Sequence, residues 1–224
     1  PLGELPALPL NTRYLWQPDS FLNQASLVEP YRKLLKTLEF RTPTPLNLLV
    51  FSSAVAGEGR STVVAHLAAV AAILNHQTLI IDTDFHNPQQ EQIFNLPHST
   101  GLADVLHHKL SLQAAIQATE VENLSVLVAG ESLLRSSLLL ETPEFKALLT
   151  QALEMFDLVI LDTPPVNAYS DALTLSQSGD GMVLVVCPGV SNRKELLRAS
   201  NELHKNGISL IGFVTNNTKG SISN

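Results

Sequence analysis

Short apolar runs alternate with longer amphipathic segments along most of the chain. Six runs have the length of a strand, and they lie at 46–52, 78–81, 124–128, 158–161, 182–187 and 209–215. Segments with the period of a helix lie at 28–40, 61–74, 88–94, 112–118, 143–156, 171–176 and 193–205. Fully apolar strands separated by helices predict an α/β fold, with a mostly parallel central sheet and helices on both faces.

The first part of the chain lacks this periodicity. Residues 1–27 are rich in Pro, Leu and Asn, and we interpret them as an extended N-terminal arm or linker. The remaining residues, 28–224, are numerous enough to bury one substantial core. We therefore expect an arm followed by one domain.

Composition and charge narrow the class of protein. Hydrophobic residues make up 45% of the chain and charged residues 16%, which is typical of a globular domain. The formal net charge of −7 provides no basic field, so we expect no nucleic-acid partner. The only cysteine, Cys187, cannot form an internal disulfide, and no apolar run reaches the roughly 18 residues of a membrane span. These features predict a cytoplasmic location.

The first strand leads into a glycine-containing loop, AVAGEGRST at 54–62, and then into a helix. Gly57 and Gly59 would let the backbone fold around phosphate oxygens, and the helix would add its N-terminal amides. Ser61 falls where a P-loop hydroxyl coordinates Mg²⁺. Two positions depart from the pattern G-x-x-x-x-G-K-[ST], because Ala54 replaces the first glycine and Arg60 replaces the lysine. Taken alone, the segment could also be a flexible loop with chance glycines.

Carboxylates follow two further strands. Asp82 and Asp84 are one residue apart after the second run, where they could hold a metal-bound water or accept a proton. The alternative is a solvated pair that caps the next helix. Asp162 follows four apolar residues, as in a Walker B element. Because all three elements occur in order at strand ends, we expect the Mg·nucleotide site of a P-loop NTPase.

Together these motifs resemble the bacterial tyrosine kinases, or BY-kinases, which regulate capsule and exopolysaccharide export. The resemblance covers about 28–217 and includes EPYRKLLKTLEF at 29–40, GLADVL at 101–106, LDTPPVNAYSDA at 161–172 and GFVTNN at 212–217. The wider group contains the MinD- and ParA-type ATPases, with a deviant Walker motif and a second lysine early in the loop. Val55 occupies that position here.

The resemblance implies ATP or ADP and Mg²⁺ as cofactors, and phosphorylation of tyrosine on a neighbouring copy. It implies nucleotide contacts from Ala56, Gly57, Glu58, Gly59, Arg60, Ser61, Thr62 and Asn216. It implies metal contacts from Ser61, Asp82 and Asp162, and catalytic roles for Asp82, Asp84 and Arg60. It further implies a homo-oligomer through Glu29 and Arg32, and a membrane chain-length regulator, fused or separate, that would hold the domain at the inner face of the plasma membrane.

Several positions depart from the family pattern. Arg60 is larger and planar, so it need not reach the position of the usual lysine. His86 stands where the family has arginine, and Leu35 stands where the oligomerisation element has its second arginine. Catalytic activity is therefore left open. One alternative is a pseudokinase scaffold with weak or no turnover, and a second is an ATPase switch of the MinD/ParA type.

Overall fold

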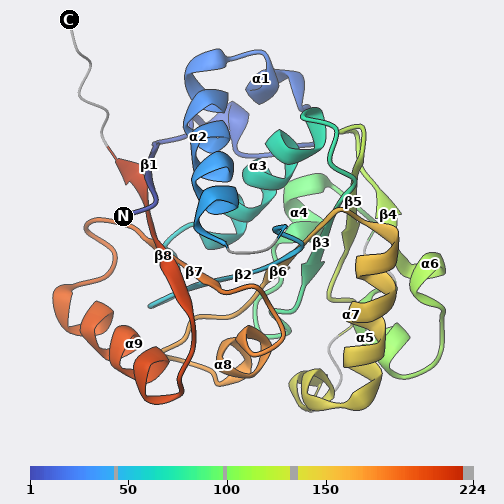
Figure 1. Ribbon diagram of the computed structural model, residues 1–224. Helices are drawn as coiled ribbons and strands as arrows, with labels where there is room; N and C mark the ends of the chain where they lie inside the picture. The colour runs from blue at the N-terminus through green and yellow to red at the C-terminus, as the bar shows by residue number, and fades with distance from the viewer. Residues whose placement is uncertain (43–44, 98–99, 132–135, 219–224) are drawn as a thin grey trace, which may run out of the picture.

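The chain folds around one mixed sheet that is parallel at all but one pairing (Figure 1). The computed structural model describes residues 1–42, 45–97, 100–131 and 136–218. In spatial order the strands are β1 (Gly3–Pro6), β8 (Leu210–Thr218), β7 (Met182–Val186), β2 (Leu48–Ser53), β6 (Leu158–Asp162), β3 (Thr78–Asp82), β5 (Leu124–Leu127) and β4 (Gln117–Ala118). Among the strands of these described ranges, only β4, at one edge, runs antiparallel to its neighbour, which is β5. The predicted fold class is confirmed.

Helices cover both faces of this sheet. One face carries α1 (Asp19–Leu22), α2 (Ala25–Arg41), α3 (Arg60–Ile73) and α4 (Gln90–Phe94). The other face carries α5 (Leu102–Leu106), α6 (Leu112–Ala115), η2 (Ser136–Glu141), α7 (Pro143–Met155), α8 (Asp171–Ser176) and α9 (Arg193–Lys205). None of the helices within the described ranges is long and apolar enough to cross a membrane.

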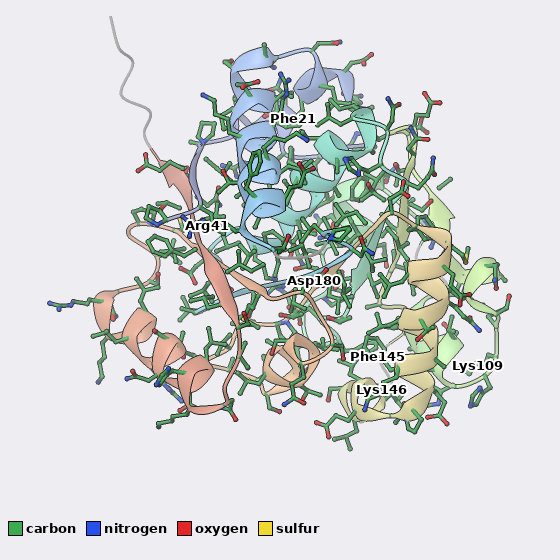
Figure 2. All side chains as sticks on the ribbon, viewed as in Figure 1. Phe21, Arg41, Lys109, Phe145, Lys146 and Asp180 are labelled. Atoms are coloured by element: carbon green, nitrogen blue, oxygen red, sulfur yellow. The ribbon has the colours of Figure 1, made fainter. Side chains whose placement is uncertain are left out.

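The central strands β7, β2, β6, β3 and β5 contribute to two cores, because successive side chains point to opposite faces. In β2, Leu49 and Phe51 pack with α2 and α3, whereas Leu48 and Val50 pack with the helices of the other face. Figure 2 shows Phe21 in the helical layer of α1 and α2, and Phe145 on α7 at the opposite side of the sheet. These central strands are thus buried on both sides, which explains their uninterrupted apolar sequence.

The N-terminal segment packs against the rest of the molecule. β1 pairs in parallel with β8, and Leu2 and Leu5 are buried. A short 3₁₀ turn, η1 (Leu10–Thr12), and α1 follow before α2 begins at Ala25. The expected division at residue 27 therefore falls inside a helix, and the division into arm and domain stays a prediction.

All six expected strands and all seven expected helices are present, with ends that differ by three residues or fewer. The elements that we did not expect are short, and they include β1, β4 and α1. β4 occupies positions that we had assigned to the end of a helix, because two residues carry too little periodicity to identify a strand.

Candidate functional site

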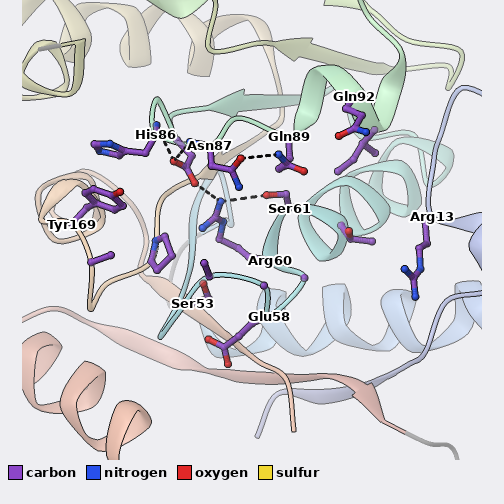
Figure 3. Close-up of a pocket in the computed structure, with 18 of the residues that line it drawn as sticks. Arg13, Ser53, Glu58, Arg60, Ser61, His86, Asn87, Gln89, Gln92 and Tyr169 are labelled. Carbon is purple, nitrogen blue, oxygen red and sulfur yellow. Dashed lines mark hydrogen bonds and ion pairs between the residues drawn. The ribbon is translucent and has the colours of Figure 1, made fainter. Parts of the chain in front are cut away.

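Three strand ends meet at the candidate site. Asp82 at the end of β3 lies in register with Asp162 at the end of β6, and β2 runs beside β6 into the loop before α3. The structure thus brings the loop and the acidic residues together, as expected for the carboxyl ends of parallel strands. A pocket of about 450 Å³ opens here, and its lining includes residues 56–62, Asp84, His86 and Tyr169 (Figure 3).

The loop has the backbone that its glycines predict. Gly57 and Gly59 have φ angles of 84° and 78°, in the left-handed region that favours glycine. A Cβ atom on Gly59 would collide with the side-chain amide of Asn216. The turn at Gly59 starts α3 at Arg60, and the first turn of this 14-residue helix, which has free N-terminal amides, lines the pocket.

The side chain of Glu58 holds the loop in place. Its carboxylate accepts hydrogen bonds from the amides of Val55 (2.9 Å) and Cys187 (3.1 Å) and from the Ser191 hydroxyl (2.6 Å). These contacts tie the loop to the end of β7. Because the carboxylate is committed to these contacts, it is not available to a ligand.

Asn216, on β8, lies behind the loop. Its side-chain amide donates to the carbonyl oxygen of Glu58 at 2.9 Å, and it is not among the residues that line the pocket. A contact between Asn216 and a nucleotide base stays a prediction, whereas its contact with the loop is direct.

Arg60 points into the group of carboxylates and not into solvent, with a side chain that is 8% exposed. Its Nε lies 2.5 Å from Asp162 Oδ1, and its Nη2 lies 2.8 Å from Asp84 Oδ2 and 3.3 Å from Ser61 Oγ. Burial disfavours the guanidinium charge, but the charges of Asp162 and Asp84 outweigh it and raise the pKa of Arg60. The cation is therefore permanently held between two anions.

Asp82 is fully buried and bonded to the backbone. Its Oδ1 accepts from the Asp84 amide at 3.1 Å, and its Oδ2 accepts from the amides of Gln89 and Gln90 at 3.0 Å each. Burial, together with the neighbouring Asp162 charge, raises the pKa of Asp82 to about 8. Asp84 lines the pocket and Asp82 does not, so Asp84 is the carboxylate of the pair that a ligand can meet.

The sequence did not reveal Gln90. Its side-chain amide donates to Asp162 Oδ2 at 2.7 Å and to the Ser61 carbonyl at 3.1 Å, so it links three elements of the site. Its Oε1 is buried without a hydrogen-bond partner among the described atoms. Nothing in the local sequence distinguishes this glutamine from Gln89, because its role depends on residues far away in the chain.

The arrangement of the carboxylates does not fit a bound Mg²⁺ ion. Asp82 and Asp162 are completely buried and are not among the residues that line the pocket, and Asp162 is already bonded to Arg60. No group of three or more His, Cys, Asp or Glu side chains in the described ranges is placed to hold a metal ion. The predicted metal ligands Ser61, Asp82 and Asp162 are close together, but as a ligand set they stay a prediction.

Aromatic residues form the rim of the pocket. The rings of His86 and Tyr169 stack with their centroids 3.6 Å apart, and His86 Nε2 lies 3.2 Å from Asp171 Oδ2. The N-terminal segment adds Arg13 and Tyr14, whose part in the site could not be anticipated from residues so far from the loop.

The expected oligomerisation residues lie elsewhere, on α2. Glu29 and Arg32 are exposed and form an ion pair at 3.5 Å. Leu35 is 1% exposed and packs inside the core, so it is not available to a partner.

Sequence comparisons agree with this geometry. Residues 47–208 match the protein-family model described as an AAA domain. The tyrosine-protein kinase YwqD of Bacillus subtilis is 34% identical over 192 residues, which are 85% of this chain and 81% of that protein. The tyrosine-protein kinase ptk of Acinetobacter johnsonii is also 34% identical, over 87% of this chain but only 27% of that longer protein.

Solved structures show the same relationship. The chimerical protein CapA2B2 superposes with a TM-score of 0.90 at 30% identity, covering 98% of this chain and 94% of that one. The septum site-determining protein MinD of Pyrococcus horikoshii, solved with Mg-ADP, has a TM-score of 0.65 at 22% identity. The match covers 79% of this chain and 72% of that one, and it shows that the two proteins share a fold. The resemblance drawn from the motifs is thus confirmed, and the chain belongs to the bacterial tyrosine-protein kinase family.

Proposed function

We propose that this chain is a nucleotide-binding domain of a BY-kinase that regulates the synthesis and export of capsule or exopolysaccharide. One observation carries the nucleotide part of the proposal. The loop at 56–59 and the first turn of α3 line one pocket, and a glycine loop that leads into a helix N-terminus attracts phosphate. ATP or ADP is the expected ligand, in keeping with the Mg-ADP of the MinD structure.

In this proposal the phosphates lie against the backbone of Ala56, Gly57, Glu58 and Gly59, while Ser61 and Thr62 contribute the amides at the start of α3. The pocket volume of about 450 Å³ is in the range of small-ligand sites. The rings of Tyr169 and His86 stand at its rim, where they could contact the rest of the nucleotide.

Calorimetric titration with ADP tests this proposal. Thr62→Asp would place a negative charge in the first turn of α3, where phosphate is expected, so ADP binding should weaken by about tenfold or more. Thr150→Asp is the matched control, because it adds the same charge at an exposed position on α7 outside the pocket. Native chain that binds no ADP, or equal loss in both variants, would contradict the proposal.

A second candidate, the pseudokinase scaffold, is favoured by the position of Arg60. Asp84 is the carboxylate best placed to accept a tyrosine proton, yet its Oδ2 is paired with Arg60 and its Oδ1 accepts the amides of His86 and Asn87. Transfer of phosphate depends on positioning and free charge, so we propose that turnover is weak.

Phosphate transfer from labelled ATP to tyrosine separates the two candidates. For the scaffold we expect little incorporation in the native chain and a rise of about tenfold or more in Arg60→Lys, which restores the lysine of the P-loop pattern. Native incorporation at the level of Arg60→Lys would instead favour an active kinase.

The cellular role follows from family membership. We propose that a membrane chain-length regulator, fused or separate, brings the domain to the inner face of the plasma membrane. The greater length of the A. johnsonii kinase is compatible with a fused arrangement in that relative. Self-association through Glu29 and Arg32 belongs to the same proposal, with the contact weakened because Leu35 replaces an arginine and is buried.

A further inference from the structure

The guanidinium of Arg60 occupies the place of a cation in this site. In P-loop NTPases a divalent cation is held by the loop hydroxyl and the Walker B carboxylate, and it joins them to the phosphates. Here both groups are already bonded to Arg60, since Asp162 Oδ1 accepts from Nε and Ser61 Oγ accepts from Nη2. Asp84 Oδ2 completes the set at 2.8 Å.

The hydrogen-bond capacity of Arg60 leaves room for a ligand. A guanidinium has five N–H donors. Nε uses its one donor on Asp162, and Nη2 uses its two on Asp84 and Ser61. No hydrogen bond from Nη1 to a described residue is present, and Arg60 lines the pocket. Two charge-assisted donors are therefore available to a phosphate oxygen, at the centre of a group that already joins the hydroxyl and both carboxylates.

The burial of Asp162 and Asp82 also argues against a metal ion at this site. Asp162 is completely buried and is covered by Arg60, and its second oxygen accepts from Gln90 at 2.7 Å. Asp82 is equally buried, and its two oxygens accept three backbone amides. An ion that entered from the pocket would have to displace an arginine paired with two carboxylates.

We propose that Arg60 is the built-in cation of this site, and that the chain binds the polyphosphate of a nucleotide without a divalent cation. The inference rests on the proposed nucleotide binding. Lysine would not reproduce this arrangement, because an ammonium has three donors on one atom, and bonds to Asp162, Asp84 and Ser61 would leave none for phosphate. With arginine in place of lysine at position 60, the cation of the site is thus a side chain and not a divalent metal ion.

Calorimetric titration with ADP, in excess magnesium chloride and in excess EDTA, tests the inference. The dissociation constants of the native chain should agree within about twofold under the two conditions. For Arg60→Lys, whose ammonium has fewer donors than the guanidinium, binding should weaken by about tenfold or more in EDTA. Circular dichroism before each titration checks that the variant is folded, and the comparison on the native chain needs no variant.

The outcomes separate this inference from the proposed function. Native binding that weakens about tenfold in EDTA would overturn the inference and leave nucleotide binding intact. Absence of binding under both conditions would overturn both. If Arg60→Lys were as insensitive to EDTA as the native chain, Arg60 would not be the source of metal independence, and the inference would also fail.

Discussion

At the scale of single residues, the identity of position 60 was evident from the sequence but its contacts were not. The motif showed that arginine replaces lysine beside Ser61. That its side chain reaches Asp162, which is 102 positions away, depends on the way in which β2 and β6 lie together. A local pattern identifies which residues are present, whereas only the fold determines which carboxylates they meet.

Gly59 gives the sharpest prediction at this scale. Gly59→Ala should destabilise the fold for two reasons, a φ angle of 78° and a collision of the new Cβ with the Asn216 amide. Gly207→Ala is the matched control, because Gly207 has a φ of 66° with nothing near its missing Cβ. The control should cost about 1 kcal/mol in free energy of unfolding, and Gly59→Ala clearly more.

Urea denaturation measures both variants. The double variant Gly59→Ala/Asn216→Ala should recover part of the loss, since the second change removes the atom in collision. Equal free energies of unfolding for the two single variants would show that the approach of Asn216 to the loop has no energetic effect.

At the scale of elements, long segments with clear end signals were predicted best. Thr142 caps α7 ahead of Pro143, and Asn192 and Glu195 form a capping box at the start of α9. Both helices begin within one residue of the expected start. The short elements β1 and β4 were missed because each draws its stability from a neighbouring strand and not from its own sequence.

His66 joins helix α3 to the 3₁₀ turn η1, and it makes the stability of the fold depend on pH. Its Nδ1 and Nε2 lie 2.7 Å from the carbonyl oxygens of Thr62 on α3 and Thr12 in η1, and its ring packs edge-on against Phe21. Burial lowers the pKa of His66 below its ordinary 6.5, although both carbonyls favour the charged ring. The neutral ring therefore stabilises the fold above pH 6.5, and this contribution is lost as the pH falls below it.

We expect His66→Gln to lower the free energy of unfolding more at about pH 8 than at about pH 5. The matched control is His204→Gln, on the exposed side of α9, which should change the free energy of unfolding little at either pH. Urea titrations at both pH values provide the comparison. A His66→Gln effect that grew toward acid pH would mean that the buried ring is protonated.

At the scale of the whole molecule, the order of the strands assembles the site from distant parts of the sequence. Apolar runs predicted the parallel sheet and, with it, the shared edge of Asp82, Asp162 and the loop. They could not predict that the N-terminal segment returns to the pocket with Arg13 and Tyr14, since that depends on distant contacts such as the bond from the Leu15 amide to the Ile93 carbonyl oxygen. The sequence therefore indicated the centre of the site but not the part that the N-terminal segment contributes.

Self-association is also a property of the whole molecule. If α2 carries the contact, Arg32→Glu should reduce the molar mass of the native oligomer toward that of the monomer, because it reverses an exposed charge beside Glu29. Arg198→Glu makes the same change on the exposed side of α9 and should leave the mass unchanged. Light scattering after size exclusion measures all three proteins. A monomeric native chain, or equal effects of the two variants, would remove α2 from the interface.

The pairing of β1 with β8 has a mechanical consequence. The strands are parallel, so the start of β1 and the end of β8 lie at opposite ends of the same ladder. A force that pulled the chain apart through these two points would load the ladder in shear, with its hydrogen bonds resisting together and not breaking one by one. Asn216, near the end of β8, is bonded to the loop at Glu58, so such a tension would reach the pocket directly.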